Sequence, residues 1–228
     1  MTSGESLSVT EALRSRFSCR AFLPRPVEAS VLRQLLETAC RSPSGGNVQP
    51  WVVHVLLGES LQRFRAMLAP KLAATPMGGK AEYNVYPPNL KEPYRARRFQ
   101  VGEDMYATIG VARDDKPGRV RQFGRNYDFF GAPATMFFLL DREMGPPQWA
   151  DIGMLMQSLM LLARERGLDT CAQEAWASWH AEVTQFLSTP PELMLFCGMA
   201  IGYRDDGAPI NALRSRRAPV EDFVTFHG

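Results

Sequence analysis

The segment that most constrains this chain is a polar turn at residues 41–51, which reads Arg-Ser-Pro-Ser-Gly-Gly-Asn-Val-Gln-Pro-Trp. It follows a helix-like pattern and precedes a continuous apolar run. Ser44 and Asn47 offer a hydroxyl and an amide, and Gly45 lets the backbone approach a ligand closely. Pro43 restricts the entry of the chain into the turn. The same residue types also occur in ordinary helix-to-strand connections, so a ligand-binding turn and a plain connector are both open at this point.

The length and the composition indicate one globular domain that covers residues 1–228. The chain holds 45% hydrophobic and 22% charged residues, which is the balance of an ordinary folded protein. No apolar run approaches the roughly 20 residues that a membrane helix needs, so we expect no membrane partner. Residues 1–10 are polar and lack the apolar core of an export signal, which predicts a cytoplasmic protein.

The charge and the cysteines disfavour two further classes of protein. The formal net charge is only +2, which is low for a general polyanion binder, so we expect no nucleic-acid partner. The cysteines have neither a Cys-x-x-Cys pair nor the spacing of metal ligands, and they stand at Cys19, Cys40, Cys171 and Cys197. We therefore expect free, mostly buried thiols and no metal site.

Hydrophobic periodicity predicts alternating helices and strands. A first helix is expected from about residue 9, where Ser8 and Glu11 fit a capping box. A last helix is expected after Ser178, which can cap it, up to about residue 187. Between them, helices are expected over residues 29–40, 59–74, 92–113 and 148–166. Strands are expected over residues 51–57, 133–140, 193–203 and, more briefly, within 168–176. The unbroken apolar run at 51–57 predicts burial on both faces of its strand. Gly198 and Gly202 predict close approach of other groups to the strand at 193–203.

Two polar segments are candidates for ligand or partner contacts. Arg16, Ser18 and Arg20 alternate, so an extended backbone would place two guanidinium groups and a hydroxyl on one face, as in a phosphate clamp. A solvated basic surface is the alternative. Residues 75–93 are rich in proline, glycine and tyrosine, and a loop of this length and composition predicts a lid or a partner contact.

Familiar nucleotide and hydrolase motifs are missing from the sequence. There is no G-x-G-x-x-G, G-x-x-x-x-G-K-[ST], H-E-x-x-H or G-x-S-x-G. The three histidines occur in unrelated contexts, which disfavours a histidine triad or a histidine metal site. Basic clusters at both ends of the chain, together with the polar turn, leave a phosphorylated cofactor as the best small-molecule candidate.

Several motifs in succession resemble the flavin-dependent nitroreductase family. They are Arg-x-Ser-x-Arg at 16–20, Ser-Pro-Ser-x-x-Asn-x-Gln-Pro-Trp at 42–51, Gly-Leu-Asp-x-Cys at 167–171, a strand that ends in Gly-Tyr at 202–203, and Arg-x-x-Arg-x-Pro at 214–219. They span nearly the whole chain. Three further pieces, at residues 86–90, 93–98 and 171–176, resemble the branch that acts on nitrobenzoates and nitroanilines.

The resemblance implies an α+β fold of three layers, in which a central, mostly antiparallel sheet is flanked by helices. It also implies an intertwined homodimer with FMN at each interface. The implied FMN-binding residues are Arg16, Ser18 and Arg20 at the phosphate and ribityl chain, Arg214 and Arg217 closing the phosphate site, Pro43, Ser44, Gly45 and Asn47 of the partner subunit, Ala172, Gln173 and Glu174 against the ring, and Asp151 at the ring edge.

The resemblance further implies an NADH- or NADPH-dependent oxidoreductase that transfers hydride through flavin N5 to nitroaromatic acceptors or quinones. Flavin chemistry belongs to the cofactor, so no catalytic acid or base is assigned, and the proton comes from solvent or from a lid tyrosine such as Tyr86. A flavin reductase, a reductive dehalogenase and a non-catalytic flavin-binding protein are alternatives that share these motifs. Ala172 and Ala175 depart from the proline and glycine that other members often carry beside the flavin.

Overall fold

The computed structural model describes residues 7–228, so the expectation about an export signal in residues 1–10 falls partly outside the described residues. The helices along this part of the chain are α1 (Val9–Ser15), α2 (Ala29–Ala39), α3 (Gly58–Ala74), α4 (Tyr94–Thr108), α5 (Lys116–Gly124), α6 (Pro146–Glu165) and α7 (His180–Leu187). The strands are β1 (Val52–Leu57), β2 (Ala134–Asp141), β3 (Asp169–Gln173) and β4 (Leu193–Gly202). Short 3₁₀ turns include η1 (Gly45–Asn47), η3 (Glu174–Trp179) and η4 (Pro209–Ala212).

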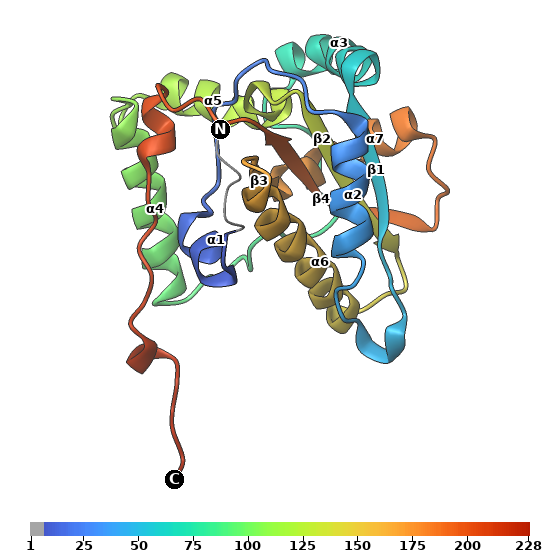
Figure 1. Cartoon of the computed structure of the whole chain (residues 1–228). Coiled ribbons are helices and arrows are strands. Elements are labelled where there is room, and N and C mark those ends of the chain that lie inside the picture. The colour runs from blue at the N-terminus through green and yellow to red at the C-terminus, as the bar shows by residue number, and fades with distance from the viewer. Residues whose placement is uncertain (1–6) are drawn as a thin grey trace, which may run out of the picture.

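The strands form one sheet in the order β1-β2-β4-β3, and every neighbouring pair is antiparallel. The chain segment before α2 adds a short parallel bridge between Ser18 and Thr170 at the outer edge of β3. Figure 1 shows the sheet with α2 and α6 beside each other across one face and α3 beyond the other. The predicted α+β fold with a mostly antiparallel sheet is confirmed.

Alternation along the central strands separates two apolar cores and so produces the three layers. In β2, Phe137 and Leu139 pack with α3 and η3 on one face, whereas Met136 and Phe138 pack with α2 and α6 on the other. All four side chains are fully buried, so β2 is covered on both faces.

Two glycines of β4 are needed because other groups approach the backbone closely. A Cβ at Gly198 would lie 2.4 Å from the Trp176 ring, and one at Gly202 would lie 2.6 Å from the Pro133 ring. The prediction of close approach at these positions is confirmed. Trp176 is fully buried at the centre of an aromatic cluster, where it stacks on Phe129 with ring centroids 4.6 Å apart.

Burial of β1 on both faces was predicted from its apolar sequence, and this prediction is wrong for the single chain. β1 lies at the edge of the sheet, and most of its residues are half-buried, with Val52 36% exposed. An apolar sequence alone cannot distinguish a central strand from an edge strand that another segment or another subunit buries.

Helix ends were predicted with mixed success. The capping box at α1 is confirmed, since Glu11 N–H donates to Ser8 Oγ at 3.2 Å and Ser8 N–H donates to the Glu11 carboxylate at 2.9 Å. The cap at Ser178 is wrong, because the turn η3 continues to Trp179 and α7 begins only at His180. The periodicity predicts no helix over residues 116–124, yet α5 forms there, and Asp115 caps it by accepting from Gly118 N–H at 2.8 Å.

The first part of the loop at residues 75–93 is attached to the body of the protein. Gly79 and Glu82 donate backbone hydrogen bonds to η3 carbonyls at 2.9 and 3.1 Å. The Glu82 carboxylate accepts from Leu195 N–H at 3.0 Å and also pairs with Arg142. The Tyr83 hydroxyl donates to the Phe196 carbonyl. Residues 84–93 follow this attachment and lead, largely exposed, into α4.

Candidate functional site

The N-terminal arm at residues 16–20 runs along the outer edge of β3. Ser18 bridges to Thr170, and Cys19 N–H donates to the Thr170 carbonyl at 3.0 Å. Phe17 and Cys19 are buried, whereas the two arginines and the serine that alternate with them are half-buried. The alternation predicted for this arm is therefore present, and its polar side chains share access to solvent.

Guanidinium groups gather beside this arm. Burial, and after it the nearby positive charge of Arg217, lower the pKa of Arg16 from its usual value. In the described part of the chain no carboxylate lies within ion-pair distance of Arg16, Arg20 or Arg217. Arg16 and Arg20 are half-buried and Arg217 is exposed. Like charges held close together without a counter-ion repel one another, so the arrangement favours an anion.

Arg214 joins the same neighbourhood by packing instead of by charge pairing. Its guanidinium lies 4.2 Å from the centroid of the Phe17 ring, and its Nη1 donates to the Asn211 carbonyl at 2.7 Å. The N- and C-terminal basic motifs, far apart in sequence, thus meet at one place.

Asn211 creates this meeting point, and sequence reasoning missed it. The side chain is buried; its Oδ1 accepts from Arg20 N–H at 2.8 Å, and its Nδ2 donates to the carbonyls of Ala21 and Asp205 at 2.8 and 2.9 Å. One amide therefore fastens the arm to the C-terminal segment. A lone asparagine at the end of a Pro-Ile-Asn run carries no sequence signal for such a role.

A second support is the buried Asp169 at the start of β3, which the Gly-Leu-Asp-x-Cys motif contains but to which the sequence analysis gave no role. Arg164 of α6 donates to Asp169 Oδ2 at 2.9 Å and to Ser15 Oγ at 3.4 Å, and Arg204 Nη1 lies 3.9 Å from the same carboxylate oxygen. Burial raises the pKa of Asp169 despite the two arginines. This network holds the end of α6 against Ser15, the residue directly before Arg16.

The end of β3 presents alternate residues to solvent. Ala172 and Glu174 are exposed, whereas Gln173 is buried and its Nε2 donates to the Asn126 carbonyl at 2.6 Å. Because the Gln173 side chain is turned inward, only the backbone of this residue can contact a ligand at the exposed side of β3. The Glu174 carboxyl lies near Tyr83, and desolvation raises its pKa above the usual value.

The polar turn folds as η1 and rests on α6. Gly45 N–H donates to both oxygens of the buried Asp151 carboxylate, at 3.4 and 3.3 Å, so this aspartate supports the turn. Ser44 Oγ accepts from Gln49 N–H at 3.0 Å. Asn47 takes a left-handed backbone, with φ at 57°, and it is exposed together with Pro43.

Within one chain, the predicted site residues fall into two separate groups. The turn contacts Asp151 near the first turns of α6, whereas Arg164 in the last turn of α6 contacts Ser15, the residue directly before the arm. Thirteen helical steps at 1.5 Å separate these two points by about 20 Å. The arm and the end of β3 form one group, and the polar turn with Asp151 forms the other.

The residues of the first group fit the phosphate of FMN. A phosphate dianion is bound best by several charge-assisted donors, and Arg16, Arg20 and Arg217 supply them beside the Ser18 hydroxyl. Among the described residues, His, Cys, Asp and Glu form no group of three or more that could hold a metal ion. The described chain also contains no helix with the length and apolarity that crossing a bilayer requires.

Comparison with known proteins agrees with this geometry. The chain is 36% identical over 217 residues to a 4-nitrobenzoate reductase of Pseudomonas putida, an alignment that covers 94% of this chain and 93% of the relative. It is 34% identical to a chloronitrobenzene nitroreductase of Comamonas testosteroni, with 96% of each chain covered.

A solved structure, the FMN- and NADPH-dependent nitroreductase NfnB from Sphigopyxis sp. strain HMH, is similar with a TM-score of 0.94 and 45% identity over 97% of this chain and 100% of that one. The sequence profile described as "Nitroreductase family" matches residues 13–203. The fold, the positions of the motifs and the similarity to these proteins all indicate the same family, and the chain therefore belongs to the nitroreductase family.

Proposed function

We propose that this protein is an FMN-dependent oxidoreductase that uses NADPH or NADH to reduce nitroaromatic compounds. The observation that carries the proposal is the group of arginines without carboxylate partners around Arg16, at the edge of β3. Relatives described as nitrobenzoate and chloronitrobenzene reductases, and similar structures described as FMN- and NADPH-dependent, support the choice of cofactor and substrate class.

The residues of the chain have separate roles in this proposal. Arg16, Arg20 and Arg217 bind the FMN phosphate, and Ser18 and Arg214 complete its surroundings. The backbone from Ala172 to Glu174 lies along the isoalloxazine ring, and Pro43, Ser44, Gly45 and Asn47 of a partner subunit cover it from the other side, with Asp151 supporting that turn. Bound FMN would supply hydride transfer between the nicotinamide and the acceptor.

The overall reaction is balanced in two-electron steps. One NADPH and one proton convert the nitro group to a nitroso group and release water, and a second NADPH and proton convert the nitroso group to a hydroxylamine. The chain therefore has to bind the donor and the acceptor in turn, exclude water from the transferred hydride, and admit one proton for each step.

A homodimer completes the site in this proposal. The two groups of site residues are supported by points of α6 about 20 Å apart, so we infer that a single chain does not enclose one flavin with both. A two-fold axis places the polar turn of one protomer beside the arginines of the other, and the same operation forms the second site.

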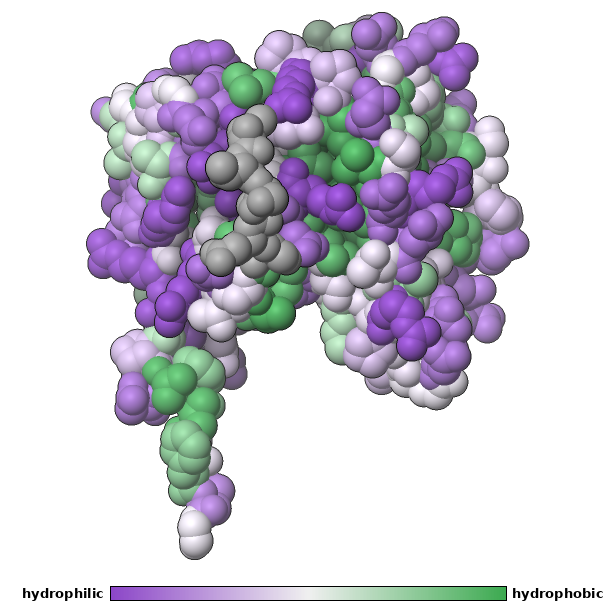
Figure 2. Space-filling view, viewed as in Figure 1, coloured by the Kyte–Doolittle hydropathy of each residue, from purple (hydrophilic) through white to green (hydrophobic). Residues whose placement is uncertain are grey.

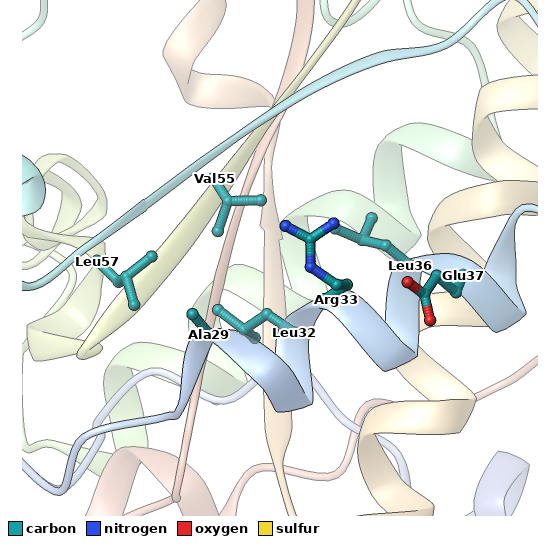
Figure 3. Close-up of a pocket in the computed structure, with 7 residues that line it drawn as sticks. All are labelled: Ala29, Leu32, Arg33, Leu36, Glu37, Val55 and Leu57. Atoms are coloured by element: carbon teal, nitrogen blue, oxygen red, sulfur yellow. The ribbon is translucent and has the colours of Figure 1, made fainter.

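An apolar groove and the C-terminal tail support this assembly. A cavity of about 350 Å³ lies between α2 and the face of β1 that packs toward α2. Figure 3 shows Leu32, Leu36, Val55 and Leu57 around it, with Arg33 and Glu37 of α2 beside them. The tail projects away from the body (Figure 2) and exposes Val220, Phe223 and Phe226, the last by 85%. We propose that the tail of each protomer covers the β1 edge of its partner, which removes both exposed apolar surfaces at once.

We also propose that residues 1–228 form one domain and that the protein is cytoplasmic. Both apolar cores share a single sheet, which supports one folding unit. The buried cysteines are free thiols, as is usual for cysteine in a reducing compartment.

An absorbance spectrum of the purified protein tests the function directly. We expect flavin bands that bleach on anaerobic addition of NADPH or NADH and return when 4-nitrobenzoate is added. Bands that do not bleach would favour a non-catalytic flavin-binding protein, and a return only with oxygen or free flavin would favour a flavin reductase. A protein that neither contains nor takes up FMN would contradict the proposal.

Variants test the residues at the phosphate. Arg20→Ala and Arg217→Ala should lose FMN during gel filtration, whereas Arg121→Ala should retain it, because Arg121 is an exposed arginine of α5 outside the site. Equal retention by all three proteins would remove the phosphate assignment.

A further inference from the structure

We propose that the side chain of Gln173 is a positioning group for the flavin ring, because it fixes the backbone at the end of β3 and thereby sets the rate of hydride transfer. The inference rests on the proposed function, in which the backbone from Ala172 to Glu174 lies along the isoalloxazine ring. Contact between Gln173 and the ring was expected from the sequence, and the structure turns its side chain into the protein instead.

The outer edge of β3 is open to a ligand beyond the N-terminal arm. Within the described chain, the arm pairs with this strand as far as Thr170, whose carbonyl accepts from Cys19 N–H at 3.0 Å. The next residue of the arm leaves the strand, since Arg20 N–H donates to Asn211. Alternation along a strand directs the backbone groups of Ala172 to the same edge as those of Thr170. The backbone of Ala172 therefore faces the side on which the ring is proposed to lie.

The side chain of Gln173 is anchored on the buried side of the strand. It is 2% exposed, and its Nε2 donates to the Asn126 carbonyl at 2.6 Å and lies 3.3 Å from Asn126 Oδ1. Asn126 is held in turn, because its Nδ2 donates to the Phe123 carbonyl at 2.8 Å. The amide of Gln173 thus connects the end of β3 to the 3₁₀ segment η2 (Arg125–Gly131).

The segment η2 has a backbone conformation that its surroundings must hold. Phe129 and Phe130 take left-handed φ angles of 53° and 55°, which are strained for residues with a Cβ. Arg65 of α3 encloses this turn, since its Nη2 donates to the carbonyls of Asp128 and Ala132 at 2.9 and 2.8 Å. Strain of this kind persists only where neighbouring contacts over-determine the conformation, so η2 is a fixed support.

The same support holds the chain a second time, just beyond β3. The ring of Phe129 stacks on Trp176 of η3, and both side chains are fully buried. Residues 173 and 176 are therefore both attached to η2, one by a hydrogen bond and the other by packing. The strand end at residues 172–174 cannot shift unless one of these two contacts is lost.

The amide of Gln173 matters more for geometry than for stability. Its Oε1 is buried and has no hydrogen-bond partner among the described residues. A buried oxygen without a partner costs free energy, whereas an apolar side chain of the same length would fill this position without that cost. What the amide adds is the position of the backbone in front of it.

Gln173→Met tests the proposal in the FMN-loaded protein, because methionine has a similar length but cannot donate to Asn126. Stopped-flow reduction of bound FMN at saturating NADPH or NADH should slow about tenfold, since a small misplacement of reacting groups has a large effect on rate. The KM for the donor should not change. The visible circular dichroism of bound FMN should differ from that of the wild type, because the surroundings of the ring have moved.

Urea unfolding of the FMN-free proteins separates positioning from stability. Gln173→Met removes one unpartnered oxygen and leaves another at the Asn126 carbonyl, so the two effects offset and the midpoint should stay close to that of the wild type. Asn126→Ala, which frees the accepting carbonyl from Phe123, should slow FMN reduction in the same way. The double variant should be no slower than Gln173→Met, because both changes break one connection.

Gln185→Met, at an exposed glutamine of α7, is the matched control and should behave as the wild type. A wild-type reduction rate together with a wild-type FMN spectrum in Gln173→Met would overturn the proposal. A raised KM without a slower reduction, or additive effects of Gln173→Met and Asn126→Ala, would overturn it as well. If neither nicotinamide reduces the FMN of the wild type, the proposed function fails, and the FMN spectra of the wild type and Gln173→Met still decide whether this amide positions the ring.

Discussion

At the scale of single residues, the candidate site depends on a few buried polar side chains that connect segments far apart in sequence. Asn211 joins the N-terminal arm to the C-terminal segment, and Asp169 joins α6 to the residue before Arg16. The exposed arginines of the site could be predicted from their spacing, because alternation in an extended segment places side chains on one face. Their supports could not be predicted, because a single buried amide or carboxylate has no periodicity.

Asn211→Ala should destabilise the protein and weaken FMN binding together. The change leaves the Arg20 N–H and two carbonyls without their partner, and one unsatisfied buried group costs about 1–3 kcal/mol. Urea unfolding of the FMN-free protein measures the stability, and fluorescence titration measures the FMN affinity. Asn84→Ala, at an exposed asparagine, should change neither. Unaltered unfolding of Asn211→Ala would remove the role that we give to this amide.

Glu174 should make the protein less stable as the pH rises through the range in which carboxyl groups titrate. Glu174 is exposed as a whole residue, but its carboxyl group is partly desolvated, which raises its pKa in the folded state. The folded chain therefore holds this proton to higher pH than the unfolded chain does, and solvent screening keeps the effect small. The free energy of unfolding therefore falls between the two pKa values, and above the folded value the loss is complete. Glu174→Gln should raise stability at pH 7, and the gain should vanish below the unfolded pKa.

Urea titrations of FMN-free protein at several pH values measure this difference. Glu192→Gln, at an exposed glutamate, supplies the comparison. A gain for Glu174→Gln that is the same at every pH would show that the carboxyl charge is not its cause.

At the scale of elements, periodicity located most helices and strands, because the apolar stripe of a helix and the apolar run of a buried strand are local patterns in the sequence. The errors arose where the neighbour decides the outcome. β1 has the sequence of a central strand but lies at an edge, and α5 is held by its Asp115 cap although it lacks a marked apolar stripe. The loop at residues 75–93 was expected to be a lid or a contact, and the structure divides it into an attached part and a largely exposed part.

Tyr83→Phe should loosen the boundary between these two parts of the loop. The change removes the hydrogen bond from the Tyr83 hydroxyl to the Phe196 carbonyl but keeps the ring against Trp149, so the expected cost is about 1 kcal/mol. Limited proteolysis should cleave residues 84–93 faster than in the wild type. Tyr94→Phe, at an exposed tyrosine of α4, should be cleaved at the wild-type rate. Identical digestion of both variants would show that the hydroxyl does not hold the loop.

At the scale of the whole molecule, the sequence motifs identified the residues of the candidate site. They did not show that one chain holds these residues in two separate groups. That division follows from the length of α6, which no motif records. The proposed assembly therefore depends on surfaces that one chain leaves open, the β1 edge and the tail.

The double variant Phe223→Ser/Phe226→Ser should weaken the dimer and release FMN. Each phenylalanine contributes about 1.5–3 kcal/mol when it is fully buried, and a symmetric dimer buries each of them twice. Light scattering over a range of protein concentrations measures the assembly. Met77→Ser, at an apolar residue that is 52% exposed outside the tail, is the control. A variant that stays dimeric at the lowest concentrations would show that the tail does not hold the protomers together.

The helix α6 also serves as a spacer of fixed length. It supports the polar turn at one end and Ser15, directly before the arm, at the other, so its number of residues sets both the distance and the angle between the two halves of the site. One inserted residue would lengthen it by 1.5 Å and rotate one end by about 100° against the other. Both cofactor sites of a dimer would then be misaligned by a single change that touches neither of them.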